Sequence, residues 1–149
     1  MITLDEALAI IHQAKDAGLV LQPANSKDPI FLCACCSCCC GVLRNLKNEE
    51  NPGSMVANPF LVEHDQALCS SCGACVEICP MAALTFDEQG IVTFRQNRCI
   101  GCGLCVTVCP SEAVHIVRRP AEQQPAIPRN TLATYLSIAK ARIDQSLSG

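Results

Sequence analysis

The chain has 149 residues and a formal net charge of −3, and its four Phe, one Tyr and no Trp exclude a large aromatic core. Its 14 cysteines indicate that metal or disulfides stabilise the fold instead. The N-terminus lacks the basic and apolar regions of a signal peptide, and no run is long enough for a membrane span, so we expect a cytoplasmic protein whose thiols bind metal.

The first predicted element is a helix that begins after Thr3. Thr3 and Glu6 have the spacing of a capping box, in which each side chain satisfies a free backbone N–H of the other residue. The apolar positions at helical spacing are Leu4, Leu8, Ile11 and Ala14. Gly18 suits the position just after a helix, and residues 19–21 predict a short strand that ends before Pro23.

A dense run of thiols follows this strand. Its six members are Cys33, Cys35, Cys36, Cys38, Cys39 and Cys40. Cys33, Cys36 and Cys39 have C-x2-C-x2-C spacing, but Cys35 and Cys38 offer a competing register. The interpretations left open are a third iron–sulfur cluster, a zinc or copper(I) thiolate site, redox-active or sulfur-carrying thiols, and no specific role. Residues 44–59 are polar, contain two Asn-Pro dipeptides and predict a linker.

Residues 61–118 contain an internal repeat in which every cysteine recurs after 30 residues. Both copies read C-x2-C-x2-C-x3-C-P, first from Cys69 to Pro80 and then from Cys99 to Pro110. Four thiolates within eleven residues suit the four iron corners of a cubane better than the widely spaced pairs of a zinc ribbon. Between the copies, two apolar segments flank Asp87-Glu88-Gln89-Gly90 and predict a β-hairpin.

The fourth cysteine of each copy precedes a proline, so we expect it to point away from its own loop and towards the other cluster. Two ligand sets follow: Cys69, Cys72, Cys75 and Cys109 for cluster I, and Cys99, Cys102, Cys105 and Cys79 for cluster II. Glycines at 73, 101 and 103 permit the backbone to approach the sulfur atoms closely. No nucleophile–base pair is present and the three histidines stand alone, so no catalytic residue is predicted.

Charge in the repeat predicts the kind of partner. Residues 61–117 hold two basic and six acidic residues, which argues against nucleic acid as a partner. Eight thiolates and two oxidised cluster cores of about +2 each would bring this segment to about −8. We therefore expect redox partner proteins with a basic docking surface and association that weakens with salt.

The last predicted elements are a proline-rich connector over residues 118–130 and a helix capped by Asn130. The apolar face of this helix consists of Leu132, Leu136, Ala139, Ile143 and Leu147. We expect this face to pack on the body of the chain, with docking to another protein as the alternative. The basic residues of this segment are interpreted as a solvated surface.

The double C-x2-C-x2-C-x3-C-P signature makes residues 63–119 similar to the bacterial two-[4Fe–4S] ferredoxins. The resemblance implies an α+β fold with a pseudo-twofold βαββαβ core and low-potential one-electron transfer. Expected strands over residues 61–65 and 114–117 fit that core. Cys39-Cys40-Gly41 is similar to a motif of disulfide-reductase subunits, and residues 5–43 resemble longer ferredoxin-type proteins from anaerobes, but neither match supplies a role.

These patterns predict three parts: an N-terminal helix and cysteine-rich region with linker (1–60), a two-[4Fe–4S] ferredoxin domain (61–118), and a connector with C-terminal helix (119–149). The predicted function is that of an electron carrier, or of an electron-transfer subunit in a larger oxidoreductase. The cofactors expected are two [4Fe–4S] clusters and a third iron–sulfur cluster or thiolate-bound metal at the N-terminal run. The alternatives are a component of a thiol/disulfide reductase whose N-terminal cysteines are catalytic, and a sensor of redox state or iron.

Overall fold

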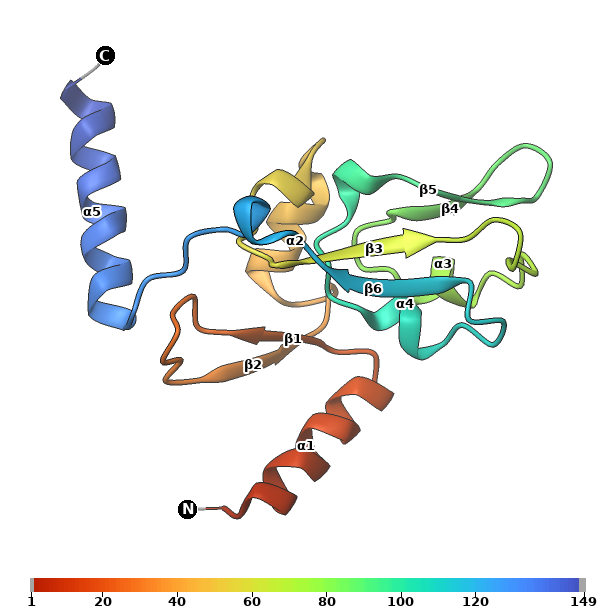
Figure 1. The fold of residues 1–149 in the computed structure, drawn as a ribbon, viewed down its shortest axis with the longest axis horizontal. Coiled ribbons are helices and arrows are strands. Elements are labelled where there is room, and N and C mark those ends of the chain that lie inside the picture. Colours follow the sequence, from red (N-terminus) through yellow and green to blue (C-terminus); the bar gives the residue numbers. More distant parts are fainter. Residues whose placement is uncertain (1, 148–149) are drawn as a thin grey trace.

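The computed structural model describes residues 2–147, the last of them by its backbone alone. It consists of short helices and two-stranded antiparallel sheets, an α+β architecture as expected (Figure 1). The helices are α1 (Leu4–Asp16), α2 (Gly41–Asn48), α3 (Ala74–Ile78), α4 (Leu104–Thr107) and α5 (Thr131–Leu147), with 3-10 turns at Pro52–Ser54, Gln96–Arg98 and Ala121–Gln123. The strands are β1 (Val20–Pro23), β2 (Leu32–Cys35), β3 (Phe60–His64), β4 (Leu84–Phe86), β5 (Val92–Phe94) and β6 (Val114–Arg118).

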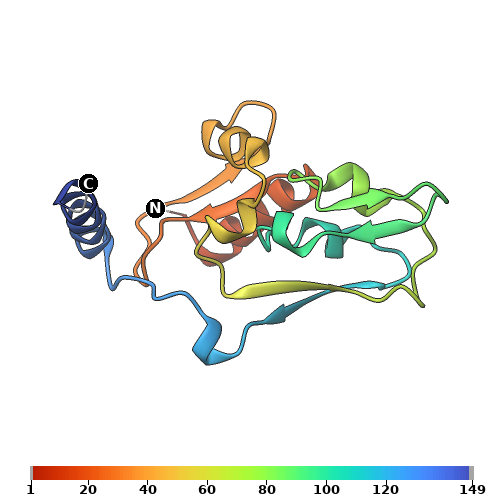
Figure 2. The same ribbon diagram turned by 90° about the horizontal axis from the view of Figure 1, so that it is seen from above.

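The repeat folds in the order β3-α3-β4-β5-α4-β6. β3 pairs with β6, the last strand of the segment, with Val62 opposite Ile116. β4 and β5 form the expected hairpin, in which Leu84 lies opposite Phe94. The predicted strands and hairpin are therefore confirmed, and α3 and α4 lie beside the β3–β6 ribbon (Figure 2).

The N-terminal helix is built as its sequence predicts. The Thr3 hydroxyl accepts the Glu6 amide at 3.2 Å, and the Glu6 carboxylate accepts the Thr3 amide at 2.7 Å, which confirms the capping box. The hydrogen bond from the Thr3 amide, followed by one from the Thr3 hydroxyl, lowers the pKa of the Glu6 carboxyl group. Gly18 follows the C-cap residue with a φ of 69°, as expected for this position.

Residues 44–59 are not simply a linker, because α2 occupies the first part of this segment. Leu43 and Leu46 lie one helical turn apart and are both buried. They join Val20, Met81, Ile100 and Leu104 in one apolar cluster, which we call the joint core. The joint core packs β1 and α2 against the repeat, so the first 60 residues share a core with the segment that follows them.

A second apolar cluster lies within the repeat and contains Val62, Leu84, Val92 and Val114. Cys75 and Cys105 belong to the same cluster and are buried. The interior of the repeat is thus formed by small aliphatic side chains and sulfur, as the scarcity of aromatic residues suggests.

Helix α5 does not pack on the body of the chain as expected. Leu132, Leu136 and Ile143 on its apolar face are 68%, 62% and 58% exposed. In the first turn of α5, the Thr134 hydroxyl donates to the Asn25 carbonyl of the β1–β2 loop at 2.8 Å, and the rest of the helix extends away from the other elements (Figures 1 and 2). The prediction for Leu147 concerns a side chain outside the described residues. Asn130 accepts the Ala133 amide at 3.0 Å, which confirms the predicted cap. Among the described residues, no helix has the length and apolar character needed to cross a membrane.

Candidate metal centres

The two cysteine loops of the repeat have matching hydrogen bonds. The amide of Ser71 donates to the Cys69 sulfur and the amide of Gly101 donates to the Cys99 sulfur, each at 3.4 Å. These donors and acceptors are related by the 30-residue shift of the sequence. Both donor residues have positive φ angles, 52° and 68°, and this conformation turns their amides towards sulfur.

The fourth cysteines of the two copies are matched in the same way. Ala83 donates its amide to the Cys79 sulfur and Ala113 donates its amide to the Cys109 sulfur, each at 3.3 Å. Backbone N–H groups aimed at sulfur favour the thiolate, which is the form that binds metal. Burial acts to raise the pKa of Cys109, but hydrogen bonds from Ser111 and from nearby amides outweigh it and lower the pKa overall.

Each loop is joined by the fourth cysteine of the other copy. Burial raises the pKa of Cys75, and negative charge on Cys69, Cys109 and Cys72 raises it further. Burial also raises the pKa of Cys105 to about 12, with further increases from Cys102, Cys99 and Cys79. Cys109 therefore lies near the first loop, and Cys79 lies near the second.

The second set surrounds a cavity. Cys79, Cys99, Cys102 and Cys105 all line it, together with apolar residues that include Met81 and Leu104. The cavity is small, with a volume of about 20 Å³. Burial raises the pKa of Cys102 to about 11 as well, because ionised thiols in an apolar site are poorly solvated. Four converging thiols that need a compensating positive charge suit a cationic iron–sulfur core.

Asn58 holds the second loop in place. Its side-chain amide donates to the Ile100 carbonyl, and its side-chain oxygen accepts the Phe60 amide at 2.8 Å. A Cβ atom added at Gly101 would overlap the Asn58 amide. From the sequence, Asn58 was interpreted only as part of an Asn-Pro turn, since its long-range contact with Ile100 has no local signal.

Replacing Gly101 with alanine is therefore expected to reduce both stability and iron content. Gly90→Ala is the matched control, because Gly90 has a φ of 78° but no atom within 4 Å of the added Cβ. The left-handed backbone should cost both variants about 1–2 kcal/mol. Gly101→Ala should lose more unfolding free energy than Gly90→Ala, because its methyl group displaces Asn58. Equal losses of unfolding free energy in chemical denaturation would contradict this account.

The N-terminal thiol run divides into two groups rather than following the spacing of Cys33, Cys36 and Cys39. Burial and a hydrogen bond with Cys40 raise the pKa of Cys35, and charge on Cys33 raises it further. The backbone amide of Leu43 is the main cause that lowers the pKa of Cys40, which is the N-cap residue of α2. Cys33, Cys35 and Cys40 thus form one group of free thiols, which we call the strand group.

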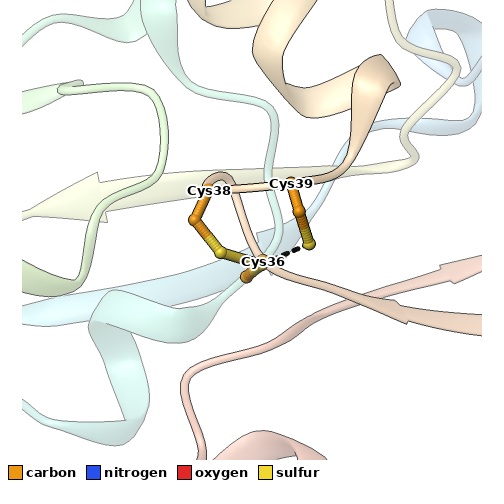
Figure 3. Close-up of side chains that lie close together, drawn as sticks. All are labelled: Cys36, Cys38 and Cys39. Atoms are coloured by element: carbon orange, nitrogen blue, oxygen red, sulfur yellow. Dashed lines mark hydrogen bonds between the residues drawn. A yellow bond between two sulfur atoms is a disulfide. The ribbon is translucent and has the colours of Figure 1, made fainter.

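The other three cysteines form the turn group, shown in Figure 3. Cys36 and Cys38 are joined by a disulfide, and the Cys39 sulfur lies 3.1 Å from the Cys36 sulfur. All three sulfur atoms lie within 4.8 Å of one another. The sequence did not predict this division, because strand β2, which carries Cys33 and Cys35, was not recognised within the run.

The joint core connects the run to the second cysteine set. Cys35 and Cys40 of the run and Cys79 and Cys102 of the second set all pack against this apolar cluster. The histidines lie outside these groups: His12 and His115 are exposed, and the buried Nε2 atom of His64 has no hydrogen-bond partner among the described residues.

Comparison with known proteins agrees with this chemistry. Residues 68–113 match the family described as "4Fe-4S dicluster domain", a span that includes all eight cysteines of the repeat. No curated protein matches the chain. The family match and the abundance of cysteine support an iron–sulfur, ferredoxin-like protein with a role in electron transfer.

Proposed function

We propose that the chain is a one-electron carrier, or the electron-transfer subunit of a larger oxidoreductase, with two [4Fe–4S] clusters in residues 61–118. Cys69, Cys72, Cys75 and Cys109 are the proposed ligands of cluster I. Cys99, Cys102, Cys105 and Cys79 are the proposed ligands of cluster II. The observation that carries the proposal is the cavity lined by Cys99, Cys102 and Cys105 of one copy together with Cys79 of the other.

The chain's residues have separable tasks in this proposal. Bound [4Fe–4S] clusters exchange one electron at a time. The amides of Ser71, Gly101, Ala83 and Ala113 stabilise negative charge on sulfur. Apolar residues such as Leu84 and Leu104 exclude water from the two sets. The acidic character of the segment favours partner proteins with a basic docking surface and disfavours nucleic acid.

A third metal or iron–sulfur site in the run Cys33–Cys40 is also part of the proposal. We place this site at the strand group, because its thiols are free and charge on Cys33 and Cys40 acts on Cys35. We assign residues 1–60 to this accessory region and residues 119–149 to a connector and helix. A cytoplasmic location fits thiols that must stay reduced.

The deciding experiment measures iron and acid-labile sulfide on protein purified without oxygen. We expect about eight of each per chain for two clusters, or about twelve if the run holds a third four-iron cluster. Electron paramagnetic resonance during a redox titration should show clusters that are reduced and reoxidised in one-electron steps. Folded protein with little iron, or clusters that resist reduction at every accessible potential, would contradict the proposal.

Salt provides an independent check of the partner surface. The rate at which the reduced protein passes electrons to a basic acceptor should fall as ionic strength rises, because screening weakens attraction between opposite charges. An acidic acceptor of similar potential is the control, and its rate should rise or stay constant. A rate for the basic acceptor that does not depend on salt would contradict electrostatic docking.

A further inference from the structure

The turn group has the arrangement needed for thiol–disulfide exchange. Cys36 takes part in a disulfide with Cys38, while the free Cys39 sulfur lies 3.1 Å from Cys36 (Figure 3). Cys36 is half-buried, and Cys38 and Cys39 are exposed. A central sulfur therefore has two alternative partners, and both are accessible to another molecule.

The backbone holds these three residues in a compact turn. The Cys40 amide donates to the Cys36 carbonyl at 3.2 Å and closes the turn between β2 and α2. β2 is paired along its length with β1, and α2 is fixed by Leu43 in the joint core. The turn thus joins two anchored elements, which keep the three sulfur atoms together when the disulfide is open.

We propose that Cys36, Cys38 and Cys39 form a two-electron exchange site that reduces an organic disulfide, with electrons supplied through the proposed clusters. The electron supply rests on the proposed function, whereas the exchange chemistry rests on the turn group alone. The joint core is the physical link, because Cys35 and Cys40 beside the turn and Cys79 and Cys102 of the second set all pack against this cluster.

The reaction balances as follows. With the turn group reduced, the Cys39 thiolate attacks the substrate disulfide, forms a mixed disulfide and releases the first thiolate. Cys36 then attacks the Cys39 sulfur, which releases the second thiolate and leaves a Cys36–Cys39 disulfide. Cys38 attacks Cys36 and releases Cys39, which gives the Cys36–Cys38 bond of the structure. Two electrons and two protons restore the thiols, so the net change is one disulfide converted to two thiols.

The test maps the disulfide in the holoprotein. Trypsin should release residues 28–44, which contain all six cysteines of the run, between Lys27 and Arg44. Dithionite supplies electrons one at a time, and alkylation followed by mass spectrometry then counts the free thiols. We expect the wild-type peptide to gain two thiols, and Cys102→Ala to gain none under the same conditions. Dithiothreitol, a direct two-electron reductant, should open the disulfide in both proteins and shows that the variant remains accessible.

Substitutions within the turn identify the role of each cysteine in disulfide exchange. Cys39→Ser should retain the Cys36–Cys38 disulfide and lose turnover of oxidised glutathione, whereas Cys38→Ser should instead form the Cys36–Cys39 disulfide. Ser37→Ala is the matched control, since it alters the turn without removing a sulfur atom, and should keep wild-type turnover. A disulfide-bonded protein substrate, assayed in parallel, distinguishes a protein disulfide from a small one.

Three outcomes would overturn the proposal: a disulfide that forms only in air and is not opened by dithionite-reduced holoprotein, metal that protects all six cysteines from alkylation, or unchanged turnover in Cys39→Ser. A chain with little iron whose disulfide still exchanges with dithiothreitol and glutathione would overturn the proposed electron-transfer function while supporting the exchange site. The two failures are therefore distinguishable.

Discussion

Replacing Cys79 with alanine is expected to remove about four irons per chain, those of the second cysteine loop and not of the loop that contains Cys79. Cys79 lines the cavity of Cys99, Cys102 and Cys105, and its charge raises the pKa of each of these three thiols. Loss of one corner ligand should therefore destabilise the cluster that those cysteines bind. Cys109→Ala should affect the first loop in the same way.

Double substitutions test directly whether each cluster takes its fourth ligand from the other copy of the repeat. Cys79→Ala combined with Cys99→Ala removes two ligands of one proposed cluster, so iron should again fall by about four per chain. Cys79→Ala combined with Cys69→Ala removes one ligand from each cluster, so iron should fall by about eight. Alanine is preferred to serine because a hydroxyl oxygen could replace sulfur as a ligand. Far-ultraviolet circular dichroism shows whether each variant is folded, and the magnetic resonance signal of the retained cluster is a second check for the Cys79 and Cys99 pair.

The opposite pattern of iron loss would contradict the exchange of fourth ligands between the two copies. If each cluster used the four cysteines of one copy, the Cys79 and Cys69 pair would lose about four irons, and the Cys79 and Cys99 pair would lose about eight. Both ligand assignments predict the same iron content for the wild-type protein, so the experiment separates ligand assignment from cluster number. Iron content alone distinguishes them, without any assay of electron transfer.

The repeat was predictable because its signals are local and occur twice. The C-x2-C-x2-C spacing fixes each loop, and the sequence between the copies has the alternation and glycine of a hairpin. The Thr3 cap and Gly18 likewise depend on neighbours within a few residues. In all of these features, nearby residues determine the backbone conformation.

The N-terminal region was less predictable because tertiary contacts determine it. α2 is a two-turn helix with only two buried residues, and Leu43 and Leu46 gain their role from Met81 and Ile100, which are distant in sequence. In the thiol run, the three-residue spacing of Cys33, Cys36 and Cys39 obscured the two-residue alternation of a strand. Composition also could not show that the apolar face of α5 is exposed among the described residues, since an apolar face indicates only that a partner is needed.

Replacing Arg98 with alanine is expected to lower the free energy of unfolding by about 2–4 kcal/mol, because three hydrogen bonds from a charged donor are lost. The Arg98 guanidinium donates to the backbone carbonyls of Met81, Glu49 and Lys47, at 2.8, 2.9 and 3.0 Å. Two of these carbonyls lie at the C-terminal end of α2, where a positive charge also interacts favourably with the negative end of the helix dipole. Arg98 thereby fastens α2 to the repeat at the edge of the joint core.

Arg98→Lys should restore only part of this loss, because one ammonium group cannot reach three carbonyls with the geometry of a guanidinium. Arg95→Ala, an exposed arginine three residues earlier, is the matched control and should lie within about 0.5 kcal/mol of the wild type. Chemical denaturation measures the loss, and amide hydrogen exchange at Leu43 and Leu46 locates it. Since Arg98 holds α2 but binds no iron in this scheme, its removal should leave the iron of the repeat in place while the cysteines before α2 react faster with alkylating agents. If Arg98→Ala also loses iron from the repeat, the joint core supports the clusters themselves.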